Sequence, residues 1–144
     1  MNDLKVKLKE TLATVFSFYL KTHMFHWNVE GPEFYQLHKM FEQIYEDVYD
    51  SIDPLAEQIR AIGSYAPGSL KRYVELSKIQ DEVSLSTPAA MVTKLIADNK
   101  IVIETLNAAF MEAEKQKQQG LMNFLADRID KHHKWEWFLT ASNK

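Results

Sequence analysis

Two histidines and three carboxylates are the residues of this sequence best suited to chemistry. They are His26, His38, Glu42, Asp53 and Glu57. Histidine nitrogen and carboxylate oxygen together suit a first-row transition metal such as iron, manganese or zinc, whereas calcium and magnesium prefer oxygen ligands alone. Taken singly, each residue is more commonly a solvated or hydrogen-bonded side chain. The metal hypothesis therefore depends on whether these residues can meet.

Their spacing determines which of them can share one ion. His38 and Asp53 lie in one segment of helical periodicity, and at 1.5 Å per residue they are roughly 22 Å apart. Metal–ligand bonds are only about 2 Å long, so a continuous helix cannot bring both residues to the same ion. His26 can approach His38 if the chain reverses at Gly31-Pro32.

The set therefore divides into two half-sites, a histidine pair (His26 and His38) and a carboxylate pair (Asp53 and Glu57). The two acids are four residues apart and share one helix face. If this helix packs antiparallel against its copy in a two-fold dimer, the histidines of one subunit meet the carboxylates of the other, and symmetry produces two identical sites. Glu42, one turn after His38, would bind a second ion or steady the other ligands.

Four long helices are predicted from the spacing of apolar residues. The second carries four of the five candidate ligands, and Gly63 suits the C′ position at its end. The third begins with Thr87 as a cap and Pro88 at the first helical position. The expected segments are Asp3–Val29, Pro32–Ile62, one that begins at Thr87, and Leu121–Ala141, with Gly120 separating the last two.

The connections predict the topology. Short links make the first and second helices antiparallel, and likewise the third and fourth. The long connection from Gly63 to Thr87 holds the turn Pro67-Gly68 and a short helix at Leu70–Leu76, and it can run back along the bundle. We expect an all-α, ferritin-like four-helix bundle with a short helix in the crossover between helices two and three, formed as a single domain by all 144 residues. A generic four-helix bundle fits the helix lengths equally well.

The composition is that of one folded domain. Hydrophobic residues make up 46% of the chain, and only 4 glycines and 4 prolines favour long uninterrupted helices. The net charge of −3 gives no general attraction to nucleic acid or anionic lipid. The absence of cysteine excludes disulfides and thiolate metal sites. We find no apolar leader and no membrane span, and we expect a cytoplasmic protein.

The candidate ligands lie in segments that resemble the Dps family, the DNA-binding proteins from starved cells, also called mini-ferritins. Residues 20–34 read LKTHMFHWNVEGPEF, residues 37–42 read LHKMFE and residues 53–63 read DPLAEQIRAIG. The spacing of His26, His38, Asp53 and Glu57 matches the family's ferroxidase ligands position for position. Residues 125–139, LADRIDKHHKWEWFL, resemble the family's last helix, so the resemblance covers nearly the whole chain.

The resemblance implies dimers that assemble into a hollow shell of twelve subunits, which oxidises Fe(II), stores Fe(III) and limits oxidative damage. It implies hydrogen peroxide rather than oxygen as the preferred oxidant, and zinc is a further candidate for the resting site. His26 and His38 would come from one subunit, and Asp53 and Glu57 from its dimer partner. Trp27 lies near the iron in the family, where it captures stray oxidising equivalents or simply packs. Larger ferritins instead use Glu-x-x-His motifs inside each bundle, and this sequence has none.

Two features leave alternatives open. Pro54 directly follows Asp53, where it either displaces the ligand through a kink or bends the helix harmlessly. The sequence has no lysine-rich tail, so we expect DNA binding to be weak or absent. The main rival function is nevertheless a non-enzymatic, DNA-compacting shell with a vestigial metal site. A third possible function is that of a simple helical interaction module.

Overall fold

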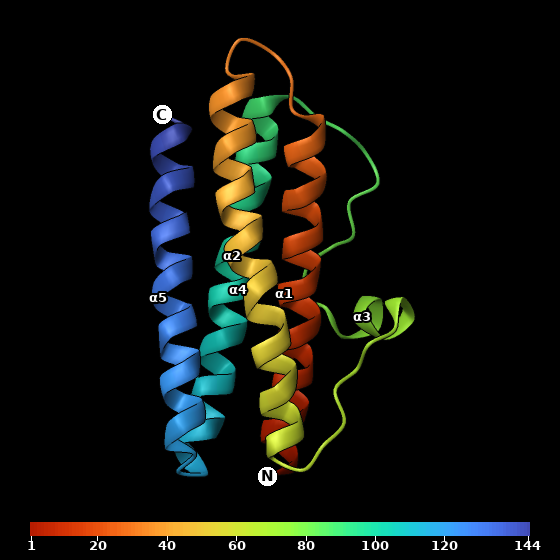
Figure 1. Ribbon diagram of the computed structural model, residues 1–144, viewed down its shortest axis with the longest axis vertical. Coiled ribbons are helices and arrows are strands. Elements are labelled where there is room, and N and C mark those ends of the chain that lie inside the picture. The colour runs from red at the N-terminus through yellow and green to blue at the C-terminus, as the bar shows by residue number, and fades with distance from the viewer.

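The computed structural model describes residues 1–144, and all of its regular structure is helical. Four long helices stand side by side, while the short helix α3 lies outside the bundle beside α1 (Figure 1). The expected all-α bundle, with a short helix in its crossover, is confirmed. None of the helices is both long and apolar enough to cross a membrane. The helices are α1 (Asn2–Asn28), α2 (Phe34–Ala61), α3 (Leu70–Leu76), α4 (Pro88–Lys115) and α5 (Gln119–Ser142).

The topology follows from one long connection. α1 and α2 are antiparallel, as are α4 and α5, and the crossover that contains α3 returns along the outer side of α1 (Figure 1). α2 and α4 therefore run in the same direction, as predicted. α1 packs against both α2 and α4, so it is the helix on which the rest of the bundle is assembled.

Most helix ends lie where the capping residues predict them. Thr87 caps α4, because its hydroxyl accepts a hydrogen bond from the Ala90 N–H at 3.2 Å. Gly63 ends α2 with a positive φ of 88°, and Ser64 N donates to Ile59 O at 3.1 Å, which closes the last turn. The predicted short helix has the expected bounds.

Two boundary predictions are wrong by two residues. α2 begins at Phe34 rather than Pro32, because Gly31 and Pro32 form a turn in which Phe34 N donates to Gly31 O at 3.0 Å. Gly120 does not separate the last two helices but lies in the first turn of α5. Lys117, with a φ of 56°, takes the left-handed position instead. The hydrogen bond from Gln118 N to α4 pairs a carbonyl at the end of that helix, as it would if glycine held the left-handed position.

Apolar stripes of the four long helices meet in one continuous core. Its largest fully buried side chains include Phe18 and Phe25 from α1 and Phe41 from α2. Burying one such aromatic side chain contributes about 1.5–3 kcal/mol, so α1 and α2 are held together firmly along the length that carries the candidate ligands.

Charged side chains also connect the helices inside the bundle. Arg128 of α5 donates two hydrogen bonds of 2.9 Å to the carboxylate of Asp47 on α2, and the indole N–H of Trp135 donates a third at 2.7 Å. Burial by itself would raise the pKa of Asp47, but these bonds and the charge of Arg128 outweigh it and hold that pKa below its usual range. Lys21 of α1 and Asp98 of α4 form a second buried pair at 2.7 Å.

His132 of α5 belongs to the same interior and is completely buried. Its Nδ1 donates to Asn99 Oδ1 at 2.8 Å, while Asn99 Nδ2 donates to the His132 carbonyl at 2.8 Å. Arg128 Nη2 lies 3.4 Å from Nε2, where it opposes a second proton on the ring. Burial and then the charge of Arg128 lower the pKa of His132 to about 3.

We expect mild acid to destabilise the bundle through His132. In the unfolded chain this imidazole binds a proton near pH 6.5, whereas in the folded protein it stays neutral down to a pKa of about 3. The free energy of unfolding therefore falls as the pH drops between these values, by up to about 1.4 kcal/mol per pH unit. Urea unfolding at about pH 7 and about pH 5 should show a smaller acid-induced loss in His132→Gln than in the wild type.

His133→Gln is the matched control, because His133 is the exposed neighbour on the same helix. It should keep the full acid-induced loss of the wild type. Equal losses in all three proteins would contradict the assignment of this pH dependence to His132.

Candidate metal centre

The turn between α1 and α2 brings His26 and His38 together. His26 lies in the last turn of α1, and His38 lies near the start of α2. The chain reverses between them through Gly31, whose φ of 125° is a backbone conformation that glycine adopts without strain. The two imidazole rings stack with their centroids 3.8 Å apart, so the approach expected from the sequence is observed.

Each histidine is oriented by a hydrogen bond to the backbone of the other. His26 Nδ1 lies 2.7 Å from the His38 carbonyl oxygen, and His38 Nδ1 lies 2.7 Å from the His26 carbonyl oxygen. A carbonyl only accepts, so in the neutral rings both Nδ1 atoms carry the proton and both Nε2 atoms keep a lone pair. The His26 carbonyl, one of the last four of α1, has no helical partner of its own. These reciprocal bonds fix the tautomer in which a histidine binds a metal through Nε2.

Glu42 joins the two histidines in a three-residue cluster. One potential ligand atom from each residue lies within 4.8 Å of the others. His26 Nε2 and Glu42 Oε1 are 3.9 Å apart, and the second carboxylate oxygen lies 3.9 Å from Lys39 Nζ. His26 is buried, while His38 and Glu42 are half-buried and open toward the surface. Two imidazole nitrogens and one carboxylate form a donor set for a first-row transition metal.

Asp53 and Glu57 lie outside this cluster. Both side chains are exposed on α2, which continues without interruption from Phe34 to Ala61. Pro54 lies inside that helix and removes one backbone donor, but it does not end the helix. Along 15 residues of continuous helix, Asp53 remains roughly 22 Å from His38. Within one subunit the carboxylate pair therefore cannot reach the ion that the histidines would hold.

The interior of the bundle offers no competing metal site. The one cluster of three or more histidines and carboxylates with ligand-like spacing is the group of His26, His38 and Glu42. His132 lies deep inside, but Asn99 occupies its Nδ1 and Arg128 faces its Nε2. A transition-metal ion would have to break this network, so the candidate centre is the one near the surface, at the junction of α1 and α2.

Aromatic rings from both α1 and α2 lie beside His26. Tyr45 lies edge-on to His26, with ring centroids 5.1 Å apart, and stacks on His23 at 3.8 Å. Trp27 also packs against His23, with ring centroids 4.1 Å apart, and 59% of the Trp27 surface is exposed. Of the aromatic residues around His26, the sequence alone singled out only Trp27. The spacing of Tyr19, His23 and Trp27, four residues apart on α1, was the available signal for this cluster.

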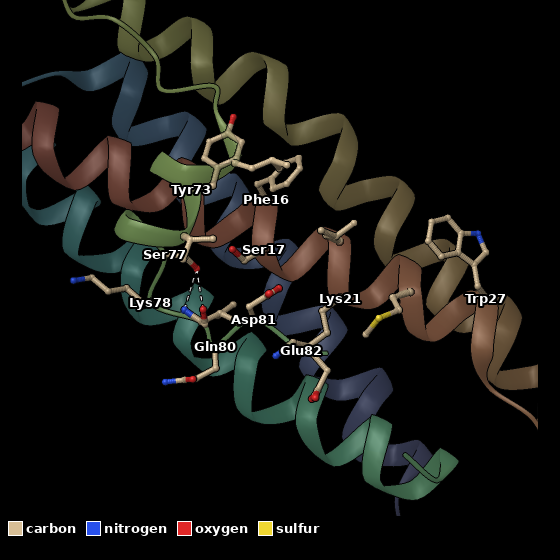
Figure 2. A pocket seen from close by; sticks show the side chains of 15 residues that line it. Phe16, Ser17, Lys21, Trp27, Tyr73, Ser77, Lys78, Gln80, Asp81 and Glu82 are labelled. Carbon is tan, nitrogen blue, oxygen red and sulfur yellow. Dashed lines mark hydrogen bonds between the residues drawn. The ribbon is translucent and has the colours of Figure 1, made fainter. Parts of the chain in front are cut away.

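A groove of about 740 Å³ runs between α1, α3 and the crossover (Figure 2). Phe16 and Tyr73 stack across one end of it, with ring centroids 4.6 Å apart, and Trp27 lies at the other end (Figure 2). Its apolar lining includes Leu20, Leu70 and Val74, all with exposed side chains. This side of the subunit is therefore apolar surface that nothing in the chain itself covers.

The fold agrees with that of known proteins. A model of the ferritin-like domain matches residues 6–143. The DNA protection during starvation protein of Helicobacter pylori is 30% identical over 135 residues, which cover 93% of this chain and 94% of that protein. The chain belongs to the Dps family of ferritin-like proteins. DNA protection during starvation protein 2 of Bacillus anthracis is 32% identical over 123 residues, which cover 85% of this chain and 84% of that protein.

Solved structures of Dps proteins have the same architecture. The Dps protein of Vibrio cholerae, described as a member of a broad superfamily of ferritin-like diiron-carboxylate proteins, superposes with a TM-score of 0.94 at 28% identity, covering 99% of this chain and 90% of that one. The family resemblance read from the sequence is thereby confirmed.

We expect Glu42 to contribute to metal affinity. Replacing Glu42 with Gln removes the carboxylate nearest the two Nε2 atoms. The affinity for a divalent ion should fall by at least about 10-fold, which is the smaller loss of affinity seen when a residue that supports a metal ligand is replaced. Titration with Co(II), followed by its visible absorption, measures this affinity. Glu46→Gln, one turn further along α2 and exposed, should leave the titration unchanged. Identical curves for both variants would remove Glu42 from the ligand set.

Proposed function

We propose that this Dps protein oxidises Fe(II) at sites shared between two subunits and stores the Fe(III) product inside a twelve-subunit cage. One observation carries the proposal: His26 and His38 present two free Nε2 lone pairs beside a single carboxylate. Such a half-site has too few protein ligands to hold iron well, and each subunit carries a second, unused carboxylate pair in Asp53 and Glu57.

The two half-sites complete each other in a two-fold dimer. When two copies of α2 pack antiparallel, Asp53 and Glu57 of the partner subunit lie against His26 and His38, and the same contact recurs on the other side of the axis. The exposed apolar groove beside α1 and α3 supports this pairing, because a second copy of the chain would bury Leu20 and Trp27. Six such dimers would form the cage.

The ligand set suits iron oxidation. Carboxylates stabilise Fe(III) more than Fe(II) because the ferric ion has the higher charge, so binding favours the oxidised product. Two histidines select a transition metal over calcium or magnesium, and zinc would compete for the same ligands in the resting protein. Iron is a substrate here, and hydrogen peroxide, in preference to oxygen, takes up its electrons. In the reducing cytoplasm this reaction would remove both Fe(II) and peroxide.

DNA binding is a separate question. Some relatives carry the name DNA protection during starvation protein. The net charge of this chain is −3, which provides no electrostatic drive toward phosphate. A mobility shift at moderate salt, with the assembled protein and duplex DNA, would separate the two functions. Retarded DNA without iron oxidation would favour the DNA-compacting shell over the ferroxidase.

The proposed activity is tested by anaerobic loading with Fe(II), followed by addition of hydrogen peroxide or oxygen. Absorbance of ferric oxide reports the rate, and gel filtration with iron analysis reports whether iron remains with a cage. We expect faster oxidation with peroxide than with oxygen, and a strong decrease in His38→Ala. A wild-type rate no higher than that of protein-free buffer would exclude the proposal.

Complementation between two inactive variants tests the shared site. His38→Ala keeps its carboxylate pair and Asp53→Ala keeps its histidine pair, so each mixed dimer regains one intact site of two. Random pairing makes half of the dimers mixed, and about one quarter of the wild-type sites should return after co-assembly. The initial rate of iron oxidation measures this fraction.

The matched control mixes His26→Ala with His38→Ala. Both changes damage the same half-site, so every site in every dimer lacks one histidine and no activity should return. Recovery in this control, or none in verified dimers of His38→Ala with Asp53→Ala, would contradict a site built from two subunits.

A further inference from the structure

His38 is the less protected of the two candidate imidazole ligands. His26 is buried, with 7% of its surface exposed, and Tyr45 lies edge-on to it with ring centroids 5.1 Å apart. His38 is half-buried in the second turn of α2 and opens toward the surface. The packing of α1 against α2 therefore encloses the His26 ring, whereas the His38 ring needs a support of its own.

A single hydrogen bond holds one edge of the His38 ring. Its Nδ1 donates to the His26 carbonyl at 2.7 Å, which sets the tautomer. The torsion χ2, about the bond from Cβ to the ring, is only weakly restrained in histidine, and an N–H···O bond tolerates a misalignment of about 30°. The ring can therefore tilt while it keeps this hydrogen bond, and each tilt changes the direction of the Nε2 lone pair.

Phe34 restrains the ring in the direction that the hydrogen bond leaves free. It is the first residue of α2 and lies one turn before His38, so the two side chains share a helix face. The phenyl ring stacks on the His38 imidazole, with centroids 4.8 Å and planes 26° apart. The His26 ring stacks on the same imidazole at 3.8 Å and 15°. Two nearly parallel rings would overlap on one face of an imidazole, so Phe34 and His26 lie on opposite faces of His38.

The surroundings of Phe34 argue against a role in the hydrophobic core. As much as 41% of its surface is exposed, and it is not among the residues that form the core or pack against it. The His38 imidazole is the aromatic ring that it contacts. Tyr35, the next residue, is also exposed, but its ring lies beside Lys39 rather than a candidate ligand. Of these two neighbouring aromatic residues, only Phe34 stacks on a residue of the candidate metal centre.

Building on the proposed ferroxidase function, we propose that Phe34 is a positioning residue of the iron site. It holds the plane of the His38 ring from one face while His26 holds it from the other, so the Nε2 lone pair keeps one direction before iron arrives. Such preorganisation reduces the cost of ordering the ligand on binding. A phenyl ring offers no ligand atom, so Phe34 acts only through His38.

This role predicts an effect on iron affinity rather than on the reaction of bound iron. Without the phenyl ring, Fe(II) has to order His38 as it binds, but once bound the ion itself holds the imidazole. In Phe34→Ala, the Fe(II) concentration that gives the half-maximal rate of oxidation should rise by about 2-fold to 10-fold, the factor that one aromatic pair contributes. The maximal rate should stay close to that of the wild type.

Titration of the assembled protein with Co(II), followed by its visible absorption, tests the role of Phe34 without any oxidation chemistry. Phe34→Ala should lower the Co(II) affinity by about 2-fold to 10-fold. Phe34→Tyr keeps a ring that can stack and should restore the wild-type affinity. The matched control Tyr35→Ala removes the neighbouring exposed ring and should leave the titration unchanged. Alanine favours the helix, so both alanine variants should keep the start of α2.

Urea unfolding of the same variants separates positioning from a purely structural role. A lower midpoint in Phe34→Ala with wild-type Co(II) affinity would overturn the proposal, because Phe34 would then only stabilise the helix end. An equal loss of affinity in Tyr35→Ala, or a loss that Phe34→Tyr does not restore, would also overturn it. Each of these results leaves the ferroxidase proposal standing if the wild type oxidises iron. Failure of the wild type to oxidise iron would instead overturn the proposed function itself.

Discussion

The rigidity of α2 is the constraint on which the functional architecture depends. This helix extends unbroken from Phe34 to Ala61 and carries His38 near one end and Asp53 toward the other. A hydrogen-bonded helix cannot fold back on itself over this distance, so the imidazole and carboxylate ligands of one chain remain apart. The same rigidity fixes the distance between the histidine pair and the carboxylate pair. In the proposed dimer, an antiparallel copy of α2 could therefore place its carboxylate pair beside the histidine pair of the first subunit.

The reciprocal bonds between His26 and His38 orient the two imidazoles of the candidate metal centre. Each Nδ1–H donates to the other residue's carbonyl, so the rings are locked by backbone atoms rather than by flexible side chains. The bond to the His26 carbonyl also satisfies an end of α1 that the helix leaves unpaired. The bond from His38 Nδ1 to the His26 carbonyl therefore both caps α1 and orients the His38 ring. A change that loosens the end of α1 would also turn this candidate ligand.

The interior of the bundle explains why the candidate centre lies near the surface. Larger ferritins place their ligands within the bundle. Here that region holds the Asp47–Arg128 pair and the completely buried His132, all satisfied by hydrogen bonds. Such a network stabilises the packing of α2, α4 and α5 and leaves no lone pair for an ion. The proposed metal chemistry would therefore need a second subunit, and the exposed apolar groove beside α3 is a surface that a second copy of the chain would cover.

Much of this was determined by the sequence alone. Apolar periodicity, Gly63 and the Thr87-Pro88 cap defined the helix ends to within two residues, because these signals are local. The spacing of His38 and Asp53 along one helix divided the candidate ligands into two half-sites. Tertiary structure decided what local signals do not contain. Lys117 rather than Gly120 makes the last turn, since its backbone strain is offset by two hydrogen bonds to α4. The tautomer of the two histidines, and the Tyr19–His23 contact with Tyr45 stacked upon it, depend on how α1 lies against α2. Those are distances between atoms far apart in the chain, and only packing sets them.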